Sequence, residues 1–252
     1  MECGAGKEHR VVLVTGASRG LGRAIAVGFG QAGYRVVVNF RTEAAEAAET
    51  VRAIETAGTG SGTAAFACQA DVREAKAVEA MVTDAVARWG RLDVLVSNAA
   101  IAEEGFVVRL AEDVWERVVA TTLTGAFHCL QSAGVVMQAQ GHGAVILIGS
   151  LSGLQGRTGQ APYAAAKAGL LGLMRSAVRE WGPAHVRVNM ILPGWHATAL
   201  TGYDDDPASA PFGPVLGHGT TMDHVARFVV ALAAMPDVSG QVFTLDSRIS
   251  ST

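Results

Sequence analysis

Short apolar runs rich in β-branched residues alternate with longer amphipathic segments along the chain. A run that is apolar at nearly every position is typical of a strand covered on both faces, as in a parallel sheet. Seven such runs predict strands: Val11–Thr15, Arg35–Asn39, Ala64–Cys68, Leu92–Ser97, Ala144–Ile148, Val186–Leu192 and Gln241–Leu245. The amphipathic segments predict six helices: Leu21–Ala32, Glu43–Ala57, Glu74–Trp89, Ala111–Gln140, Ala161–Trp181 and Met222–Ala234.

This alternation predicts an α/β fold with a doubly wound, seven-stranded parallel sheet and helices on both faces. No linker, repeat or block of charge divides the chain, so residues 1–252 are expected to form a single domain. The segment 196–219, before the last predicted strand, is rich in Gly, Pro and Asp. A long irregular segment in a compact domain is often functional, so we expect a lid or substrate loop there. The alternative is an ordinary surface excursion.

Composition narrows the class of protein. Lys and Arg number 20 against 23 Asp and Glu, a net charge of −3, which argues against a nucleic-acid partner because such a protein needs a basic face. No stretch approaches the ~18 uninterrupted apolar residues of a membrane span. The cysteines, Cys3, Cys68 and Cys129, are odd in number and widely spaced. That pattern favours neither a disulfide framework nor a zinc site, and it fits a reducing, cytoplasmic setting.

A glycine-rich turn follows the first predicted strand. Gly16, Gly20 and Gly22 lie in the segment Gly16-Ala17-Ser18-Arg19-Gly20-Leu21-Gly22, and a predicted helix comes next. Glycine permits a tight turn and a close backbone approach, and the helix N-terminus offers free N–H groups to an anion. In a chain with 30 glycines such spacing can arise by chance. Its place between a strand and a helix favours a turn that binds pyrophosphate.

The end of the second predicted strand bears on the choice of nucleotide. A site for NAD usually carries Asp or Glu here, to bind the ribose 2′-hydroxyl. This chain has Asn39-Phe40-Arg41 instead. Arg41, together with Arg19 of the glycine-rich turn, is suited to pair with a 2′-phosphate, which favours NADP(H). The alternative is that both arginines are solvated surface residues.

A second cluster of residues is suited to proton transfer. Tyr163 and Lys167 lie four residues apart at the start of a predicted helix, so their side chains share one face. An ammonium beside a phenol is expected to lower the pKa of Tyr163 toward the working range of a proton donor and acceptor. Ser150 follows the fifth predicted strand, at the edge where an open α/β sheet presents groups to a ligand. Its hydroxyl is placed to hold a substrate carbonyl oxygen.

Taken together, these motifs resemble the short-chain dehydrogenase/reductase family, and most closely its β-ketoacyl carrier-protein reductase branch. The resemblance covers nearly the whole chain and implies a single-domain Rossmann fold with NADPH as cofactor. It implies that Ser150, Tyr163 and Lys167 are catalytic at the family's spacing. The cofactor-binding residues that it implies are Gly16, Ser18, Arg19, Gly20, Leu21, Gly22, Asn39, Arg41, Asp71, Val72, Asn98, Ala99, Ala100, Tyr163, Lys167, Pro193, Gly194 and Thr198.

The resemblance also implies a mechanism. This chain departs from the family at Thr122, at Ala100 and at Asp246-Ser247-Arg248, which stands where the family has Asp-Gly-Gly near its C-terminus. A hydride from NADPH would reduce a ketone whose oxygen Ser150 holds and Tyr163 protonates, while Lys167 binds the nicotinamide ribose. The family's fourth catalytic residue is an Asn that orders a water, and Thr122 occupies its position here. We expect a hydroxyl to bind that water less fully and to slow the proton relay. Ala100 replaces a glycine, and its methyl is expected to shift the ribose.

The substrate is the least defined part of this interpretation. The expected contacts are Ser150, Leu154, Tyr163, Trp195 and His196, although a loop histidine is often only solvated. The expected substrate is a β-ketoacyl thioester, carried by coenzyme A or by an acyl carrier protein as partner, in fatty-acid or specialised polyketide synthesis. An acidic carrier protein needs basic residues near the site, and the positions that carry arginine in related reductases, near Gly141 and Ala184, are uncharged here.

Other readings of the same motifs stay open. One is an NADP-dependent dehydrogenase or reductase of free small alcohols or ketones, since one site catalyses both directions. Another is a non-catalytic sensor that binds NADP(H). The resemblance also implies a homotetramer or a homodimer. No metal site is expected, because Asp204–Asp206 has no His or Cys at ligand spacing.

Overall fold

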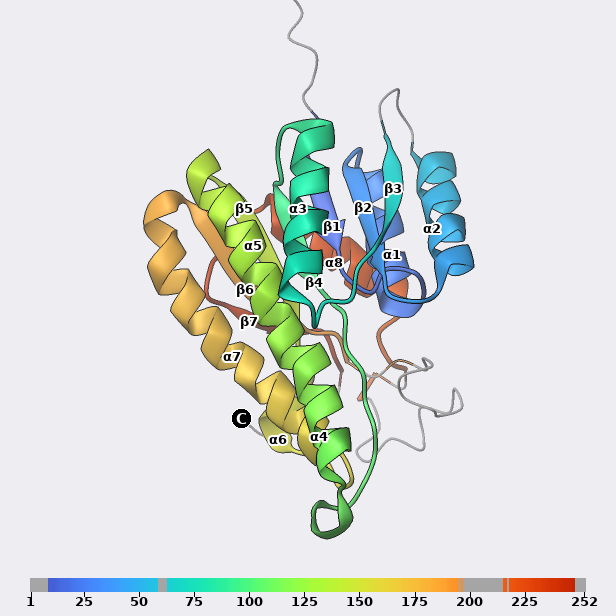
Figure 1. The fold of residues 1–252 in the computed structure, drawn as a ribbon, viewed down its shortest axis with the longest axis vertical. Coiled ribbons are helices and arrows are strands. Elements are labelled where there is room, and N and C mark those ends of the chain that lie inside the picture. The colour runs from blue at the N-terminus through green and yellow to red at the C-terminus, as the bar shows by residue number, and fades with distance from the viewer. Residues whose placement is uncertain (1–8, 59–62, 195, 197–214, 217, 248–252) are drawn as a thin grey trace, which may run out of the picture.

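The computed structural model describes residues 9–58, 63–194, 196, 215–216 and 218–247. In this part of the chain seven strands form one sheet in the order β3-β2-β1-β4-β5-β6-β7, and every adjacent pair is parallel (Figure 1). The strands are β1 Val11–Val14, β2 Arg35–Phe40, β3 Ala65–Gln69, β4 Val94–Ser97, β5 Gly143–Ile148, β6 Val186–Leu192 and β7 Val242–Thr244. The predicted α/β fold with a doubly wound, seven-stranded parallel sheet is confirmed.

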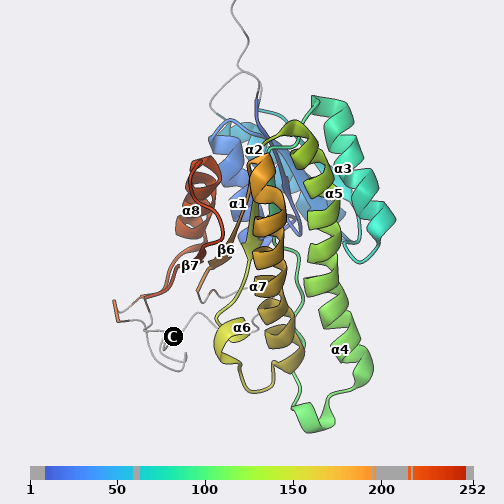
Figure 2. The same cartoon turned by 90° about the vertical axis from the view of Figure 1, so that its left-hand side faces the viewer.

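Helices cover both faces of the sheet. On one side lie α1, α2 and α8, and on the other lie α3, α5 and α7, with the sheet between them (Figure 2). The main helices are α1 Gly20–Gln31, α2 Ala44–Ala57, α3 Ala75–Trp89, α4 Glu112–Val119, α5 Gly125–Gln140, α7 Ala161–Trp181 and α8 Met222–Ala234. Shorter helical pieces are η1 Val107–Arg109, η2 Ala120–Thr124, α6 Ser152–Gln155 and η3 Gly182–Ala184.

Alternate residues of each central strand enter opposite cores, which explains why the strands are apolar throughout. Val11 and Leu13 of β1 pack with α3, α5 and α7. Val12 and Val14 pack with α1, α2 and α8. All four side chains are fully buried. A strand covered on both faces has no polar side, and this is the physical reason that uninterrupted apolar runs predicted a parallel sheet.

The strand order reverses between β1 and β4. From β1 the chain builds outward through β2 and β3, then returns to add β4 on the other side of β1. In an open α/β sheet the loops diverge at such a point and leave a crevice beyond the carboxyl ends of the strands. In Figure 1 this edge faces downward, where α4, α6 and the start of α7 extend past the sheet.

One predicted helix has an irregularity that the sequence pattern did not reveal. The expected helix Ala111–Gln140 is a continuous helical path made of α4, a π-helical turn at Ala120–Thr124 and α5. A π-helical turn contains an extra residue and is frequent at functional sites. Directly after it, Gly125 packs so closely on Val72 that a Cβ would lie 2.6 Å from Val72 Cγ2.

Two features bear on earlier expectations. Most of the predicted lid, 196–219, lies outside the described residues; of it, the structure describes residues 196, 215, 216, 218 and 219. Among the helices it does describe, none combines the length and the hydropathy needed to cross a membrane.

Candidate active site

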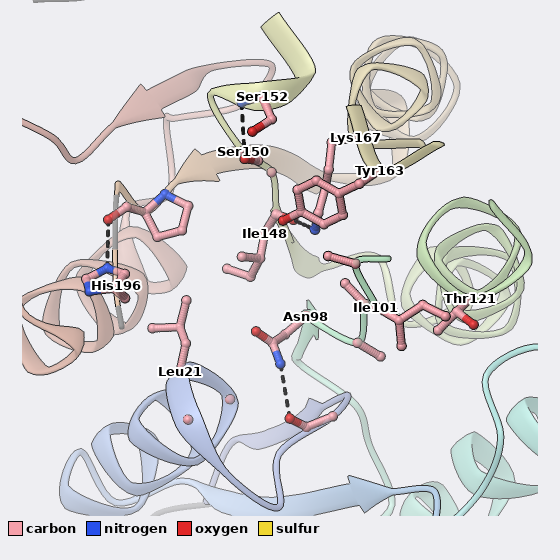
Figure 3. Close-up of a pocket in the computed structure, with 18 of the residues that line it drawn as sticks. Leu21, Asn98, Ile101, Thr121, Ile148, Ser150, Ser152, Tyr163, Lys167 and His196 are labelled. Carbon is pink, nitrogen blue, oxygen red and sulfur yellow. Dashed lines mark hydrogen bonds between the residues drawn. The ribbon is translucent and has the colours of Figure 1, made fainter. Parts of the chain in front are cut away.

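A cavity of about 1040 Å³ opens at the carboxyl edge of the sheet. In Figure 3, Ser150, Tyr163 and Lys167 lie on one side of it, with Leu21 and Asn98 on the facing side. It brings together nearly all of the predicted site residues: Gly16, Ser18, Arg19, Gly20, Leu21, Gly22, Asn39, Arg41, Asp71, Val72, Asn98, Ala99, Ala100, Ser150, Tyr163, Lys167, Pro193, Gly194 and His196.

The glycine-rich turn requires glycine at each of its three positions. Gly16 and Gly20 have φ of +61° and +56°, in the left-handed region that side chains disfavour. At Gly22 a Cβ would lie 2.3 Å from the carbonyl oxygen of Gly16 and 2.6 Å from Nδ2 of Asn98. Real Cβ atoms do not approach backbone so closely, so any side chain there would displace the turn.

The N-terminus of α1 is suited to an anion. Its N-cap residue, Arg19, makes no capping hydrogen bond through its side chain, and the first turn contains no acidic residue. A Cβ added at Gly20 would meet nothing within 4 Å. The helix therefore presents its first N–H groups and the positive end of its dipole to open space in the cavity, which is the chemistry that binds phosphate.

Thr15 and Asn98 join the glycine-rich turn to the end of β4. The Thr15 hydroxyl oxygen accepts from the backbone N–H groups of Asn98, at 2.9 Å, and Ala99, at 3.0 Å. In return, Asn98 Nδ2 donates to the carbonyl oxygens of Thr15, at 2.9 Å, and Gly16, at 3.1 Å. Sequence reasoning missed Thr15, whose signal was a polar residue ending an apolar strand.

Asn39 braces the turn from the other side. Its Oδ1 accepts from Gly16 N–H at 3.2 Å, and its Nδ2 donates to the carbonyl oxygens of Cys68, at 3.3 Å, and Ala70, at 3.0 Å. The Asn39 side chain is buried, and both its oxygen and its nitrogen form hydrogen bonds with backbone atoms. At the position where an acid would bind a ribose 2′-hydroxyl, this chain therefore has a structural amide. Arg19 and Arg41 line the cavity nearby, and both are exposed.

Asp71 lies at the far end of this side of the cavity. Arg73 binds its carboxylate through two nitrogens, with Nε at 3.0 Å and Nη2 at 2.6 Å from Oδ2. The Arg73 guanidinium holds the pKa of Asp71 below its ordinary value. Asp71 is therefore a charged acceptor across the neutral range, already paired on one side.

The three expected catalytic residues come together from two elements. Ser150 follows β5, and Tyr163 and Lys167 lie one turn apart on α7. The Ser150 hydroxyl is near enough to the Tyr163 phenol to lower the pKa of that phenol. Lys167 Nζ lies 5.6 Å from the centroid of the Tyr163 ring and donates to the carbonyl oxygen of Ile148 at 2.5 Å. The serine oxygen also accepts from the N–H of Ser152 at 3.2 Å.

Burial dominates the electrostatics of this cluster, which corrects one expectation. The pKa of Tyr163 is raised by burial, and the nearby Ser150 hydroxyl offsets part of that rise. Burial lowers the pKa of Lys167 to about 7. The expectation that the Lys167 ammonium lowers the tyrosine pKa is therefore wrong for this arrangement. Desolvation disfavours the charged form of both groups at once.

Thr122 lies where the expected Asn would be, but it does not line the cavity. It lies in the π-helical turn, is buried, and is 3.4 Å from both the N and the O of Ile101. Its neighbour Thr121 lines the cavity instead. The side chain of Thr122 thus braces the loop after β4 by two long contacts.

Of the remaining residues that we expected to contact substrate or cofactor, one lines the cavity, one does not, and two lie outside the described residues. His196 is buried in the cavity wall, where its Nε2 donates to the carbonyl oxygen of Pro193 at 2.8 Å and burial lowers its pKa. Leu154, on α6, is half exposed and does not line the cavity. Trp195 and Thr198 lie outside the described residues.

Gln160 is a residue that the sequence reading missed. It is the N-cap of α7 and is buried. Its Oε1 accepts from Ser152 Oγ at 3.2 Å, and its Nε2 donates to Glu104 at 3.3 Å. It therefore ties the loop after β5 to the loop after β4 beside the catalytic serine.

The structure shows no metal-binding arrangement in the part of the chain that it describes: His, Cys, Asp and Glu there form no group of three or more that could hold a metal ion. Asp204–Asp206 lies outside that part.

Comparison with known proteins gives a consistent family. A family model described as short chain dehydrogenase matches residues 10–208. The 3-oxoacyl-[acyl-carrier-protein] reductase FabG of Staphylococcus aureus is 41% identical over 195 residues, which are 77% of this chain and 78% of the relative. The 3-oxoacyl-[acyl-carrier-protein] reductase of Synechocystis is 35% identical over 239 residues, 94% of this chain and 95% of the relative.

A solved structure supports the same family. The crystal structure of a Sinorhizobium meliloti 1021 protein, provisionally described as a short-chain alcohol dehydrogenase, superposes with a TM-score of 0.80 at 34% identity. The match covers 94% of this chain and 95% of that one. Fold, cavity and sequence therefore agree, and the chain belongs to the short-chain dehydrogenase family of oxidoreductases.

Proposed function

We propose that the protein is an NADPH-dependent ketoreductase that reduces a β-ketoacyl thioester to the hydroxy thioester. The observation that carries this proposal is the meeting, in one cavity, of the Ser150, Tyr163 and Lys167 cluster with an uncapped helix N-terminus behind a glycine-rich turn. The first is suited to a carbonyl oxygen and its proton, and the second to a phosphorylated cofactor.

The cofactor fits the residues present. The open backbone at Gly20 and the first turn of α1 would bind its pyrophosphate, and Arg19 and Arg41 its 2′-phosphate. Asn98, Ala99 and the α7 residues would hold the nicotinamide end. When bound, the reduced nicotinamide supplies the hydride. NADPH is favoured over NADH because Asn39, at the end of β2, is occupied with backbone and offers no carboxylate to a ribose hydroxyl.

The chain's own residues would handle the oxygen and its proton. The Ser150 hydroxyl would donate to the substrate carbonyl oxygen and orient it. Tyr163 would protonate that oxygen as negative charge develops on it. Burial raises the pKa of Tyr163, so the phenol keeps its proton at neutral pH, as a general acid must. Lys167, whose pKa is lowered to about 7, can gain or lose a proton there without large cost.

The thioester assignment is supported by the S. aureus and Synechocystis relatives, both named 3-oxoacyl-[acyl-carrier-protein] reductases. A second candidate substrate is a free small alcohol or ketone, which the description of the S. meliloti structure favours. The chemistry at Ser150 and Tyr163 is the same in both cases.

The test is a panel of substrates measured with each cofactor. The purified protein should oxidise NADPH in the presence of acetoacetyl-CoA and longer β-ketoacyl thioesters, with NADH at least about tenfold less effective. Turnover of free ketones alone would replace the thioester by the second candidate. Tight NADPH binding without turnover of any carbonyl compound would contradict the proposal.

A further inference from the structure

A second, shallower depression adjoins the catalytic cavity. It has a volume of about 300 Å³ and is lined by Phe106, Val107, Val108, Gly159 and Ala161, together with Arg157 and Thr158. Phe106 precedes η1, and Val107 and Val108 lie within it, so one wall is a short apolar segment. The opposite wall is the turn that leads into α7. We refer to this depression as the apolar groove.

The apolar groove borders the catalytic cavity. Arg157 and Thr158 line both spaces. The cavity side of this boundary also includes Gln160 and Tyr163. A ligand whose reacting carbon lies at Tyr163 would reach the groove by extending over the Arg157–Thr158 edge.

Hydrogen bonds fix the two walls of the groove to each other and to the catalytic serine. Gly105 N–H donates to the carbonyl oxygen of Gly159 at 2.8 Å, directly beside Phe106. Gln160, next to the groove residue Gly159, binds Glu104, two residues before Phe106, and Ser152 of α6. Ser152 N–H in turn donates to Ser150 Oγ. The groove is thus held at a set distance from the group that would orient the substrate carbonyl.

Three consecutive apolar side chains are left exposed at this place. The exposed fractions are 63% for Phe106, 74% for Val107 and 89% for Val108. Apolar residues exposed one after another next to a cavity contribute little to the core and mark a binding surface. Their position at the mouth of the catalytic cavity, and not on a remote face, indicates a part of the substrate as the occupant.

We propose that the apolar groove binds the aliphatic tail of the carbonyl substrate, so that the enzyme favours substrates with an extended alkyl chain. This inference rests on the proposed ketoreductase function and specifies the substrate class of the same site. Its recognition element is the Phe106–Val108 segment, which lies outside the predicted catalytic and cofactor-binding residues.

The proposal predicts a dependence on chain length. Burying one methylene contributes about 0.8 kcal/mol, which is about fourfold in kcat/KM. In a series of β-ketoacyl-CoA esters from acetoacetyl to β-ketododecanoyl, kcat/KM should rise by up to about fourfold per methylene until the groove is filled. A parallel series of straight-chain methyl ketones measures the same tail without a thioester.

Variants of the groove should remove this dependence. The double variant Val107→Asp/Val108→Asp places two carboxylates on the groove wall, and both positions are exposed enough to accept them. It should lose at least about tenfold in kcat/KM for the longest substrate and stay within about twofold for acetoacetyl-CoA. Val107→Thr/Val108→Thr keeps the shape and should give a smaller loss. The control is Val135→Asp on α5, exposed to 67% and outside the groove lining.

The possible results distinguish failure of the groove proposal from failure of the proposed ketoreductase function. If acetoacetyl-CoA is reduced but the length series is flat, or the double variant keeps the wild-type slope, the groove proposal is wrong and the ketoreductase proposal stands. If only methyl ketones are reduced and the double variant loses their length dependence, the thioester is wrong and the groove stands. If the double variant changes the sedimentation coefficient of the protein and leaves the slope unaltered, the segment is a subunit contact, and the groove proposal is overturned.

Discussion

On the side of the cavity formed by β1 and α1, the surface is largely backbone, whereas on the side formed by β5 and α7 it is made of side chains. On the β1 and α1 side, glycines with positive φ and the uncapped first turn of α1 face the opening. The side chains of Thr15, Asn39 and Asn98 form hydrogen bonds with that backbone. On the β5 and α7 side, Ser150 and Tyr163 project into the space.

This difference predicts how substitutions on each side of the cavity affect folding, cofactor binding and rate. A site made of backbone changes shape when a side chain is added beneath it, so substitutions there should alter folding and cofactor binding together. A site made of side chains can lose a reacting atom while the backbone stays in place, so removal of a reacting hydroxyl there should lower the rate and leave the fold unchanged. The predictions below test that division, beginning with the largest effect.

Tyr163→Phe should abolish most of the activity and little else. The variant keeps the buried ring and loses only the hydroxyl that would protonate the substrate oxygen, so kcat should fall by about a hundredfold to ten-thousandfold. NADPH affinity, followed by fluorescence titration, should change less than about twofold. Wild-type kcat in this variant would exclude Tyr163 as the acid.

Gly22→Ala should destabilise the fold itself. Its Cβ would lie 2.3 Å from the Gly16 carbonyl oxygen, so the turn must move, and we expect a loss of about 3 kcal/mol in the free energy of unfolding. Gly172→Ala is the matched control, because a Cβ at this position of α7 meets nothing within 4 Å. It should instead stabilise by about 0.5–1 kcal/mol. Urea unfolding of both variants measures the difference, and equal stabilities would contradict the division.

Lys167→Met should stabilise the protein while impairing it as a catalyst. Lys167 has a pKa of about 7 in the fold and an ordinary value of 10.5. Between these values the unfolded chain binds a proton that the folded chain does not, so wild-type stability rises with pH. The advantage of the variant should therefore be greatest below pH 7, at about 2 kcal/mol, and shrink toward pH 10.5. Thermal unfolding across this range is the measurement, and a gap that widens with pH would refute the burial effect.

Arg41→Ala should have the smallest effect, confined to one cofactor. Loss of a charge-assisted hydrogen bond to a 2′-phosphate should weaken NADPH binding by about tenfold and leave NADH binding unchanged. Arg52→Ala, an exposed arginine on α2, is the control for a change of net charge. Equal losses for both cofactors would indicate that Arg41 does not distinguish them.

The sequence predicted well what depends on neighbours along the chain. The strand–glycine–helix succession at Gly16–Gly22 and the spacing of Tyr163 and Lys167 are local patterns, and the structure brings both into one cavity. The apolar runs predicted the parallel sheet because each strand there is covered on both faces.

What the sequence did not predict depends on contacts between distant segments. The pairing of Gln160 with Glu104 joins residues 56 positions apart. The lowered pKa of Lys167 follows from complete burial, which no spacing pattern reports. The contact of Thr122 with Ile101 belongs to the same class.

The π-helical turn at Ala120–Thr124 has a consequence for how this chain can vary in length. Each residue of an α-helix turns the chain by about 100°, so an extra residue rotates everything that follows by that angle. The rotation sets which face of α5 meets the sheet, including Gly125 against Val72. A deletion of one residue in this turn would give a more regular helix with the wrong face inward. The irregular turn therefore preserves the angular phase between α4, beside the cavity, and α5, which covers the core.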